Sequence, residues 1–171
     1  MPPTVETTNL ILRPLTLDDA EAYWPLVRLP EVLRYVGEDP KPALAAVRET
    51  LLTRPMRDYA VHGYGRMACI EKSSGRLVGF SGLKYLEDWQ ETDVGYRFLP
   101  ECWGKGYATE SAAALMAQGR DAFGIRRFMG LVMPGNGASA RVLEKLGLVY
   151  ERTFDPDDGH GPLQLYGTPP A

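Results

Sequence analysis

The amino-acid sequence predicts an α/β (α+β) fold with a mixed central sheet of about seven strands and flanking helices. First, the early strand-like runs follow one another through short turns, which is typical of antiparallel strands. Second, the later runs alternate with helical segments, as in strand–helix–strand units. Third, 171 residues with 44% apolar and 24% charged side chains suit one ordinary globular domain. We therefore expect a single domain over residues 1–171, with a sheet that is antiparallel in its first half.

The first part of the chain is expected to hold two helices and a strand meander. A short helix begins near Asp18, after the helix-start residue Thr16, and runs to Pro25 or slightly beyond. A second helix covers residues 43–52, and the pattern changes after Arg54 and Pro55. The expected strands are residues 9–15, 65–72, 77–86 and 92–99, the middle two forming a hairpin around Ser74-Gly75.

The second part is expected to alternate. A helix follows a glycine-rich turn and covers residues 107 to about 123. A strand over residues 125–133 leads through a Pro-Gly-Asn turn to a helix over residues 138–146. That helix ends at Gly147, a residue type that suits a helix C-terminus. Residues 148–154 and 162–167 are two closing strands.

Composition excludes several classes of protein. The net charge of −3 argues against broad binding of nucleic acid. We find no apolar run near the ~20 residues that span a bilayer and no leader pattern, so we expect no membrane segment. Two cysteines and two histidines form neither a disulfide framework nor a metal-ligand spacing. We expect no metal, a reducing, cytoplasmic compartment, and Cys69 and Cys102 as buried thiols.

Acidic residues gather in two stretches of the chain. They are Glu87, Asp88, Glu91 and Asp93 in the first, and Asp155, Asp157 and Asp158 in the second. Solvated loops are the simpler interpretation. The alternative is a surface that attracts a cationic substrate.

The stretch PECWGKGYATES, from Pro100 to Ser111, carries the strongest chemical signal. Its glycines, Gly104 and Gly106, lie where a helix begins, and a helix start leaves about four backbone N–H groups unpaired and attracts phosphate. Glycine also lets a ligand approach the main chain. The spelling fits neither a Walker loop nor a dinucleotide GxGxxG. An anion site and a plain tight turn both remain as interpretations.

In order along the chain, NLILRPLTLDD, RLVGFSGL, DVGYRFLPECWGKGYATES and NGASARVLEKLGLVYE resemble the GNAT superfamily of acetyl-coenzyme A-dependent N-acetyltransferases. Within it they are most similar to the RimJ/RimL-like branch of ribosomal-protein N-terminal acetyltransferases. The resemblance covers most of the chain and implies the GNAT fold. In that fold the fourth and fifth strands splay apart, here residues 92–99 and 127–133, and the pantetheine arm lies between them.

The resemblance also implies the residues that bind acetyl-CoA. Backbone amides near the start of the long helix would hold the pyrophosphate, although Trp103 stands where the family usually has Gln or Arg. The expected coenzyme-binding residues are Trp103, Gly104, Lys105, Gly106, Tyr107, Ala108, Thr109, Asn136 and Ser139. We expect Lys105 to point to solvent or to a phosphate.

Catalytic candidates follow from the same resemblance. Many family members carry a tyrosine acid at the position of Leu143, so Ser139 is the substitute candidate. Asn136 and Ser139 are equally typical helix-cap residues. Asp93 and Glu91 are the candidate bases, acting through a water on the amine. The aromatic candidates for an acceptor pocket are Tyr96, Trp89 and Tyr166.

These residues together predict transfer of an acetyl group from acetyl-CoA to a primary amine by direct attack on the thioester. The acceptor is a small-molecule or peptide amine: a protein N-terminus, a polyamine, an aminoglycoside or another small amine. A non-catalytic acyl-CoA-binding or sensing module on the same fold is the alternative, and a nucleotide-binding protein of another class is a third hypothesis. A homodimer is one compatible assembly.

Overall fold

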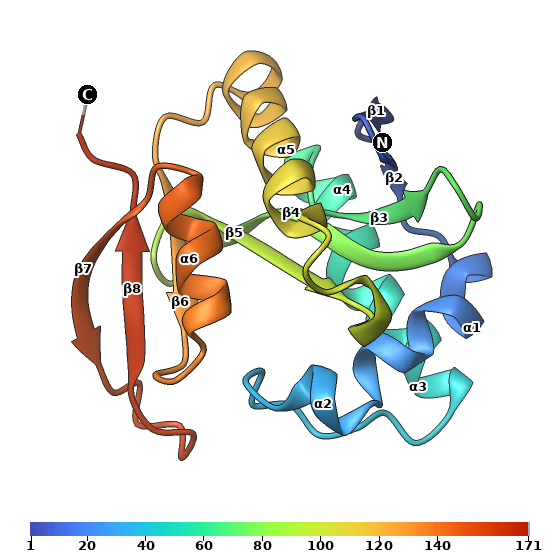
Figure 1. Ribbon diagram of the computed structural model, residues 1–171, viewed down its shortest axis with the longest axis horizontal. Helices are drawn as coiled ribbons and strands as arrows, with labels where there is room; N and C mark the ends of the chain where they lie inside the picture. Colours follow the sequence, from blue (N-terminus) through green and yellow to red (C-terminus); the bar gives the residue numbers. More distant parts are fainter. Residues whose placement is uncertain (171) are drawn as a thin grey trace.

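The computed structural model describes residues 1–170, and its centre is an eight-stranded mixed sheet (Figure 1). The strands are β1 (Val5–Glu6), β2 (Leu10–Pro14), β3 (Arg66–Glu71), β4 (Leu77–Leu86), β5 (Glu91–Phe98), β6 (Phe128–Val132), β7 (Val149–Phe154) and β8 (Leu163–Gly167). Their order in the sheet is β1-β2-β3-β4-β5-β6-β8-β7. The mixed α/β fold and the antiparallel first half are confirmed. The expected sheet of about seven strands lacked β1, because a two-residue strand is too short to show an alternating apolar pattern in the sequence.

Six α-helices surround the sheet within the described residues 1–170. They are α1 (Ala20–Tyr23), α2 (Pro30–Leu33), α3 (Leu44–Leu51), α4 (Arg57–His62), α5 (Tyr107–Phe123) and α6 (Gly137–Lys145). Short 3₁₀ turns cover Leu17–Asp19, Trp24–Val27 and Pro100–Cys102. The prediction for α5 is confirmed. The first expected helix is instead a 3₁₀–α–3₁₀ run.

The helix expected over residues 43–52 is followed by a helical path through Pro55 that was not predicted. Leu52–Met56 forms a π-helical turn that joins α3 directly to α4. Proline has no N–H to donate, and the wider turn holds it inside a continuous helical path. Pro55 is buried there. Packing around the buried Pro55 therefore keeps the helical path continuous, although proline usually ends a helix.

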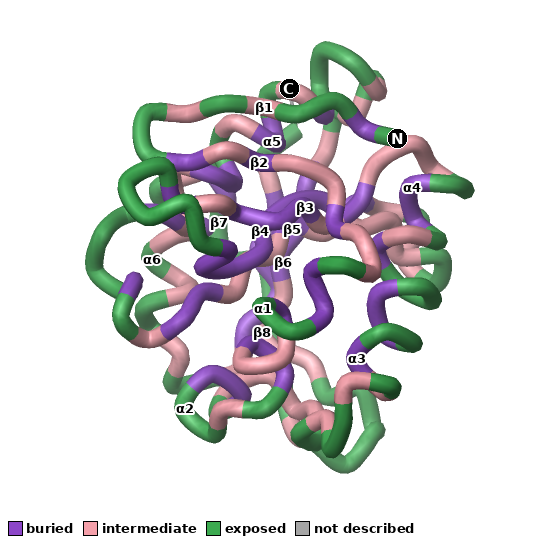
Figure 2. Tube along the Cα trace, turned by 90° about the vertical axis from the view of Figure 1, so that its right-hand side faces the viewer, coloured by how far each residue is buried: buried purple, intermediate pink, exposed green. Residues whose placement is uncertain are grey.

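Helices cover both faces of the sheet (Figure 1). On one face, α1 and α3 pack with Ala68 and Phe80 in one apolar cluster. On the other, α5 and α6 pack with Leu83, Val94 and Phe128. Buried residues concentrate along the central strands, and exposed residues along the outer loops (Figure 2). Burial of apolar surface on both faces is the main stabilising contribution.

Strands β5 and β6 are parallel neighbours that soon diverge. Their register holds only the pairs Thr92↔Phe128 and Asp93↔Met129. Beyond these pairs β5 continues beside β4, and β6 continues beside β8. The expected splay of these two strands is confirmed, and we call the opening beyond Asp93 and Met129 the slot.

Two further expectations concern burial and apolar length. Cys69 and Cys102 are buried free thiols, as predicted. Among residues 1–170, none of the helices combines the length and apolar character needed to cross a membrane.

Candidate active site

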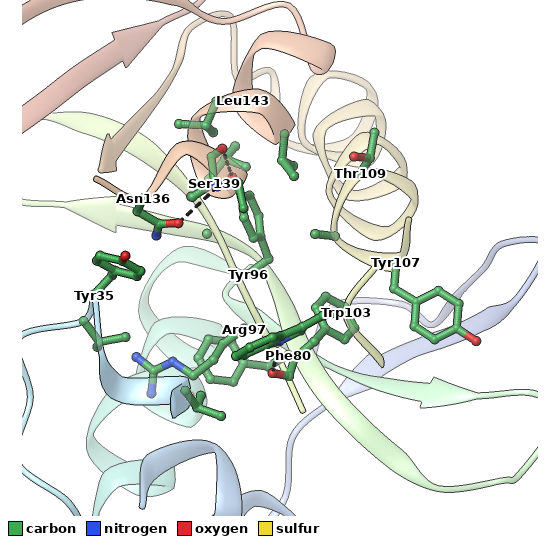
Figure 3. A pocket seen from close by; sticks show the side chains of 18 of the residues that line it. Tyr35, Phe80, Tyr96, Arg97, Trp103, Tyr107, Thr109, Asn136, Ser139 and Leu143 are labelled. Carbon is green, nitrogen blue, oxygen red and sulfur yellow. Dashed lines mark hydrogen bonds between the residues drawn. The ribbon is translucent and has the colours of Figure 1, made fainter. Parts of the chain in front are cut away.

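A pocket of about 850 Å³ lies along the slot. Its walls come from α2 and the residues after it, β4, β5, the start of α5, β6 and α6 (Figure 3). This volume suits a sizeable organic ligand. All the expected coenzyme-binding residues line it except Lys105.

The turn between β5 and α5 presents open backbone to this pocket. Gly104 and Gly106 have φ angles of +80° and +79°, the left-handed region that glycine adopts without a Cβ penalty. A Cβ built at either position meets no heavy atom within 4 Å. Trp103, whose side chain is half exposed, donates its indole N–H to the Phe98 carbonyl at 2.9 Å. The turn is therefore anchored to β5 while its glycines stay accessible.

The first turn of α5 has no side-chain cap. Gly106 is the N-cap residue, and no side chain of residues 1–170 accepts a hydrogen bond as its cap. The nearest acid, Glu110, is occupied: it accepts hydrogen bonds from Thr7 Oγ1 at 2.6 Å and from the Asn9 backbone at 2.7 Å. The free N–H groups and the partial positive charge of the helix start thus face the pocket. This arrangement suits a phosphate.

Lys105 does not line the pocket, and its half-exposed side chain agrees with the expected orientation toward solvent. Its ammonium lies 3.4 Å from Glu71 Oε2, on the side away from the pocket. The Tyr107 hydroxyl donates to the same oxygen at 2.9 Å. This hydrogen bond holds the pKa of Glu71 down at about 2. Glu71 therefore secures the first residue of α5 and draws Lys105 toward β3, a long-range pairing that local sequence cannot reveal.

Asn136 caps α6, as one interpretation predicted. Its Oδ1 accepts a hydrogen bond from the Ser139 backbone N–H at 3.3 Å. The Ser139 hydroxyl makes no cap and points into the pocket beside Tyr96 (Figure 3). Leu143, the position where the resemblance led us to look for a tyrosine acid, is buried in the cluster with α5. Ser139 is thus free for another role.

Tyr96 bridges the slot from β5 to α6. Its hydroxyl donates to the Ser139 carbonyl at 2.8 Å and lies 3.1 Å from Ser139 Oγ. Burial raises the pKa of this phenol to about 12. The hydroxyl therefore stays protonated at neutral pH and can donate a hydrogen bond. It joins the two elements at the point where the sheet has opened.

Asp93 lines the pocket and pairs with Arg66 on β3. Arg66 Nη2 lies 2.5 Å from Asp93 Oδ2, and the two side chains are 17% and 14% exposed. Arg66 also donates to the carbonyls of Gly82 and Asp93. Burial raises the pKa of Asp93 above its ordinary 3.8, and the charge of Arg66 opposes this shift. The carboxylate is held rigidly at the end of the slot.

Glu91 lies outside the pocket lining and binds Arg127 Nε at 3.0 Å. Arg127 also binds Glu151 at 2.9 Å. Of the three aromatic residues predicted to line an acceptor pocket, one lies in the pocket and two lie beside it. Tyr96 lines the pocket, whereas the Trp89 ring packs 5.3 Å from that of Phe154 and the buried Tyr166 ring packs 5.9 Å from that of Tyr150. Trp89 and Tyr166 therefore belong to the packing beside the pocket, which corrects their placement.

The prediction that the two acidic stretches are solvated loops holds for one of them. Asp155, Asp157 and Asp158 are exposed, and the carboxylates of the first and third accept backbone N–H groups within tight turns. In the other stretch, Asp93 and Glu91 face arginines. Within residues 1–170, only Asp93 and Glu91 of these seven acidic residues are thus paired with an arginine.

In the described part of the chain, four arginines line the pocket and none of them was predicted; Arg66 and Arg97 are the two that are largely buried. Both lie on strands with buried neighbours, and Arg97 follows Asp93 and Gly95 at a period of two. A charged residue at an inward position of a strand is the signal that could have found Arg97.

Comparison with known proteins adds an independent line of evidence. The family model described as "Acetyltransferase (GNAT) domain" matches residues 9–149. YoaA of Bacillus subtilis (strain 168), described as an uncharacterised N-acetyltransferase, is 30% identical over 150 residues. The match covers 87% of this chain and 84% of YoaA.

Solved structures show the same fold. An acetyltransferase from Agrobacterium tumefaciens str. C58 superposes with a TM-score of 0.83 at 24% identity, covering 99% of this chain and 96% of that one. RimL, a ribosomal L7/L12 alpha-N-protein acetyltransferase in complex with coenzyme A, superposes with a TM-score of 0.82 at 18% identity, covering 96% and 97%. Because the family model spans most of the chain and YoaA is similar across it, the chain belongs to the GNAT acetyltransferase family.

Proposed function

We propose that this acetyltransferase moves an acetyl group from acetyl-CoA to a primary amine, either a protein N-terminus or a small-molecule amine, by direct attack on the thioester. One observation carries the proposal: the uncapped, glycine-opened start of α5 lies beside the slot where β5 and β6 part. GNAT acetyltransferases use acetyl-CoA. Its thioester supplies the activated acetyl group.

The residues around the slot fit the coenzyme. The backbone of residues 103–109 would hold the diphosphate, with no side chain to displace at Gly104 or Gly106. The unpaired edges of β5 and β6 would pair with the amides of the pantetheine arm by β-addition. Asn136 and Ser139, at the start of α6, form the wall beside that arm.

Asp93 is the proposed base, acting through a water on the incoming ammonium. An amine must be neutral to attack, because an ammonium has no lone pair. Burial raises the pKa of Asp93, and this brings the carboxylate closer to the working pH of a base. Arg66 keeps its orientation. Asp93 is preferred over Glu91 because it lines the pocket.

Ser139 is proposed to donate a hydrogen bond to the departing sulfur, and Tyr96, whose single O–H donates to the Ser139 carbonyl, is proposed to position Ser139. A thiol has a pKa near ~8.5, so its thiolate is already a tolerable leaving group and full protonation by a phenol is not required. The Tyr96 hydroxyl orients Ser139 through both of its contacts. Positioning by these groups, more than acid strength, is expected to accelerate the reaction.

Changing Ser139 to alanine tests this role. We expect kcat to fall about 10- to 100-fold, the value of one lost hydrogen bond to developing charge. The dissociation constant of acetyl-CoA should change less than about threefold, since the Asn136 cap uses the Ser139 backbone. Steady-state kinetics and calorimetry separate the two quantities. Ser139→Thr, which keeps a hydroxyl, should recover part of the rate, and an unaltered rate in Ser139→Ala would remove Ser139 from the chemistry.

A screen of peptides and small amines, with thiol release and mass spectrometry as readouts, tests the function itself. We expect one product heavier by an acetyl group and one thiol released for each acetyl transferred. Binding of acetyl-CoA without thiol release for any amine would favour the alternative, an acyl-CoA-binding or sensing module. Stabilisation by ATP or NAD but not by acetyl-CoA would contradict both.

The cellular compartment and the partners of the protein are also proposals. Two buried free thiols suit a cytoplasmic protein, and the net charge of −3 suits an enzyme that does not bind nucleic acid. A homodimer and the absence of a membrane partner stay predictions.

A further inference from the structure

Arg97 lies in the pocket on the same face of β5 as Asp93. Its side chain is only 13% exposed. The guanidinium extends toward the side of the pocket where Tyr35 lies, away from the start of α5 (Figure 3). Its neighbours Leu26 and Phe80 belong to the apolar cluster on the α1 and α3 face of the sheet. Arg97 is therefore on the face opposite to α5 and α6, where an acceptor rather than the coenzyme diphosphate would lie.

The hydrogen-bonding capacity of Arg97 is only partly used. Nη1 donates to the Leu26 carbonyl at 3.1 Å. The same nitrogen lies 3.7 Å from Glu38 Oε2, beyond hydrogen-bond distance, and Glu38 binds Arg54 more closely at 2.9 Å. Across residues 1–170, neither Nε nor Nη2 donates a hydrogen bond to the protein, and the only ion pair of the guanidinium is the 3.7 Å contact with Glu38. One edge of the guanidinium is thus free.

This free edge is energetically significant because the charge is largely removed from water. Burial lowers the pKa of Arg97 below its ordinary value, although an arginine remains protonated at any physiological pH. A buried charge is costly unless it is paired and hydrogen-bonded. Arg66, by contrast, is bound by Asp93 and two backbone carbonyls. The Phe80 ring, 5.0 Å from Arg97 Cζ, fixes the plane of the guanidinium.

The free Nε–Nη2 edge has the shape that binds a carboxylate through two parallel hydrogen bonds. We propose that Arg97 binds a carboxylate of the acceptor, so that the preferred substrates are amines that carry a carboxylate. The proposal rests on the acetyl transfer proposed above. Asp93 and Arg97 are four residues apart on β5, about 13 Å between Cα atoms. An acceptor that reaches both therefore holds its amine and its carboxylate several bonds apart.

Matched pairs of substrates test the proposal. The panel contains amino carboxylates H₂N–(CH₂)n–COO⁻ of increasing length, each with its primary amide, and the C-terminally amidated dipeptide Gly-Glu-NH₂ with Gly-Gln-NH₂. For the best spacer we expect kcat/KM of the acid to exceed that of its amide about 10- to 100-fold, the value of a charge-assisted pair. The two arms distinguish a small-molecule carboxylate from one on a peptide.

Arg97→Gln should reduce this acid-to-amide ratio to near one and leave the amide rate within about threefold of the wild type. The ratio is measured within one protein, so partial loss of folded enzyme does not affect it. Arg28→Gln is the matched control. Arg28 is an exposed arginine that stacks on Trp24 outside the pocket lining, and its change should leave the ratio intact.

Calorimetry of the same pairs in the presence of coenzyme A measures binding without turnover. Arg97-dependent binding of acids would support this inference even if no amine were acetylated, in which case only the proposed function would fail. Equal binding and equal rates for acids and amides in the wild type would overturn the inference while acetyl transfer stood. An Arg97→Gln protein that lost affinity for coenzyme A and for both substrates alike would overturn it as well.

Discussion

Valine at position 106 is expected to abolish binding of acetyl-CoA, with affinity reduced by more than about 100-fold. Two or three hydrogen bonds from the main chain to a charged phosphate, each contributing about 1.5–3 kcal/mol, are lost when a side chain fills the mouth of α5. The backbone φ of +79° at Gly106 also disfavours valine, at a cost of about 1–2 kcal/mol of folding free energy. Calorimetric titration with acetyl-CoA measures the loss.

The control for this change lies at the other end of the same helix. Gly124, the C-cap residue of α5, has φ of +65° and open space around a built Cβ. Gly124→Val therefore carries a similar backbone strain but lies outside the pocket lining. We expect the two variants to lose similar melting temperature and only Gly106→Val to lose coenzyme. Equal coenzyme affinities in the two variants would disprove the phosphate-binding role of the turn.

Asparagine at position 93 is expected to lower kcat/KM about 10²- to 10⁴-fold, the range for loss of a general base. In the wild type, the rate should fall as the pH decreases through the pKa of Asp93, because the protonated carboxyl cannot accept a proton. Burial places that pKa above 3.8, so the decline begins at a higher pH than for an exposed aspartate. The pH–rate profile of Asp93→Asn should lack this acidic limb.

Glu91→Gln is the matched control, because Glu91 lies on the same strand but binds Arg127 outside the pocket. Its kcat/KM should stay within about threefold of the wild type, and its acidic limb should persist. Melting curves and coenzyme affinity establish that Asp93→Asn is folded despite the altered partner of Arg66. If the acidic limb survived in Asp93→Asn, or disappeared in Glu91→Gln, Asp93 would not be the base.

The sequence was most informative where local chemistry decides structure. Residues 100–111 indicated a helix start after two glycines, with an anion site as one of two interpretations, and the structure has an uncapped helix start at Gly106. The hairpin of β3 and β4 was visible from alternation and a Ser-Gly turn. In these segments local preference and the final packing agree.

The sequence was least informative where contacts between residues far apart in the chain determine the structure. The helical path from α3 to α4 was not predicted, because it runs through Pro55, which is buried in a π-helical turn. Lys105 looked like a phosphate ligand, but Glu71, far away in sequence, attracts it. The role of Arg97 depends on which carbonyls and rings surround it, and these come from three separate segments. No window of neighbouring residues contains that information.

The narrow contact between β5 and β6 has a mechanical consequence. Two residue pairs form the only ladder between the strands β1–β5 and the strands β6–β8 among residues 1–170. The sheet thus consists of two hydrogen-bonded parts that share a short seam. Beyond this seam the two parts are joined by side chains, through the apolar cluster with α5 and α6 and the contacts of Tyr96 with Ser139. A linear amide-containing molecule laid in the slot would act as an added strand, so substrate loading would make the whole domain stiffer.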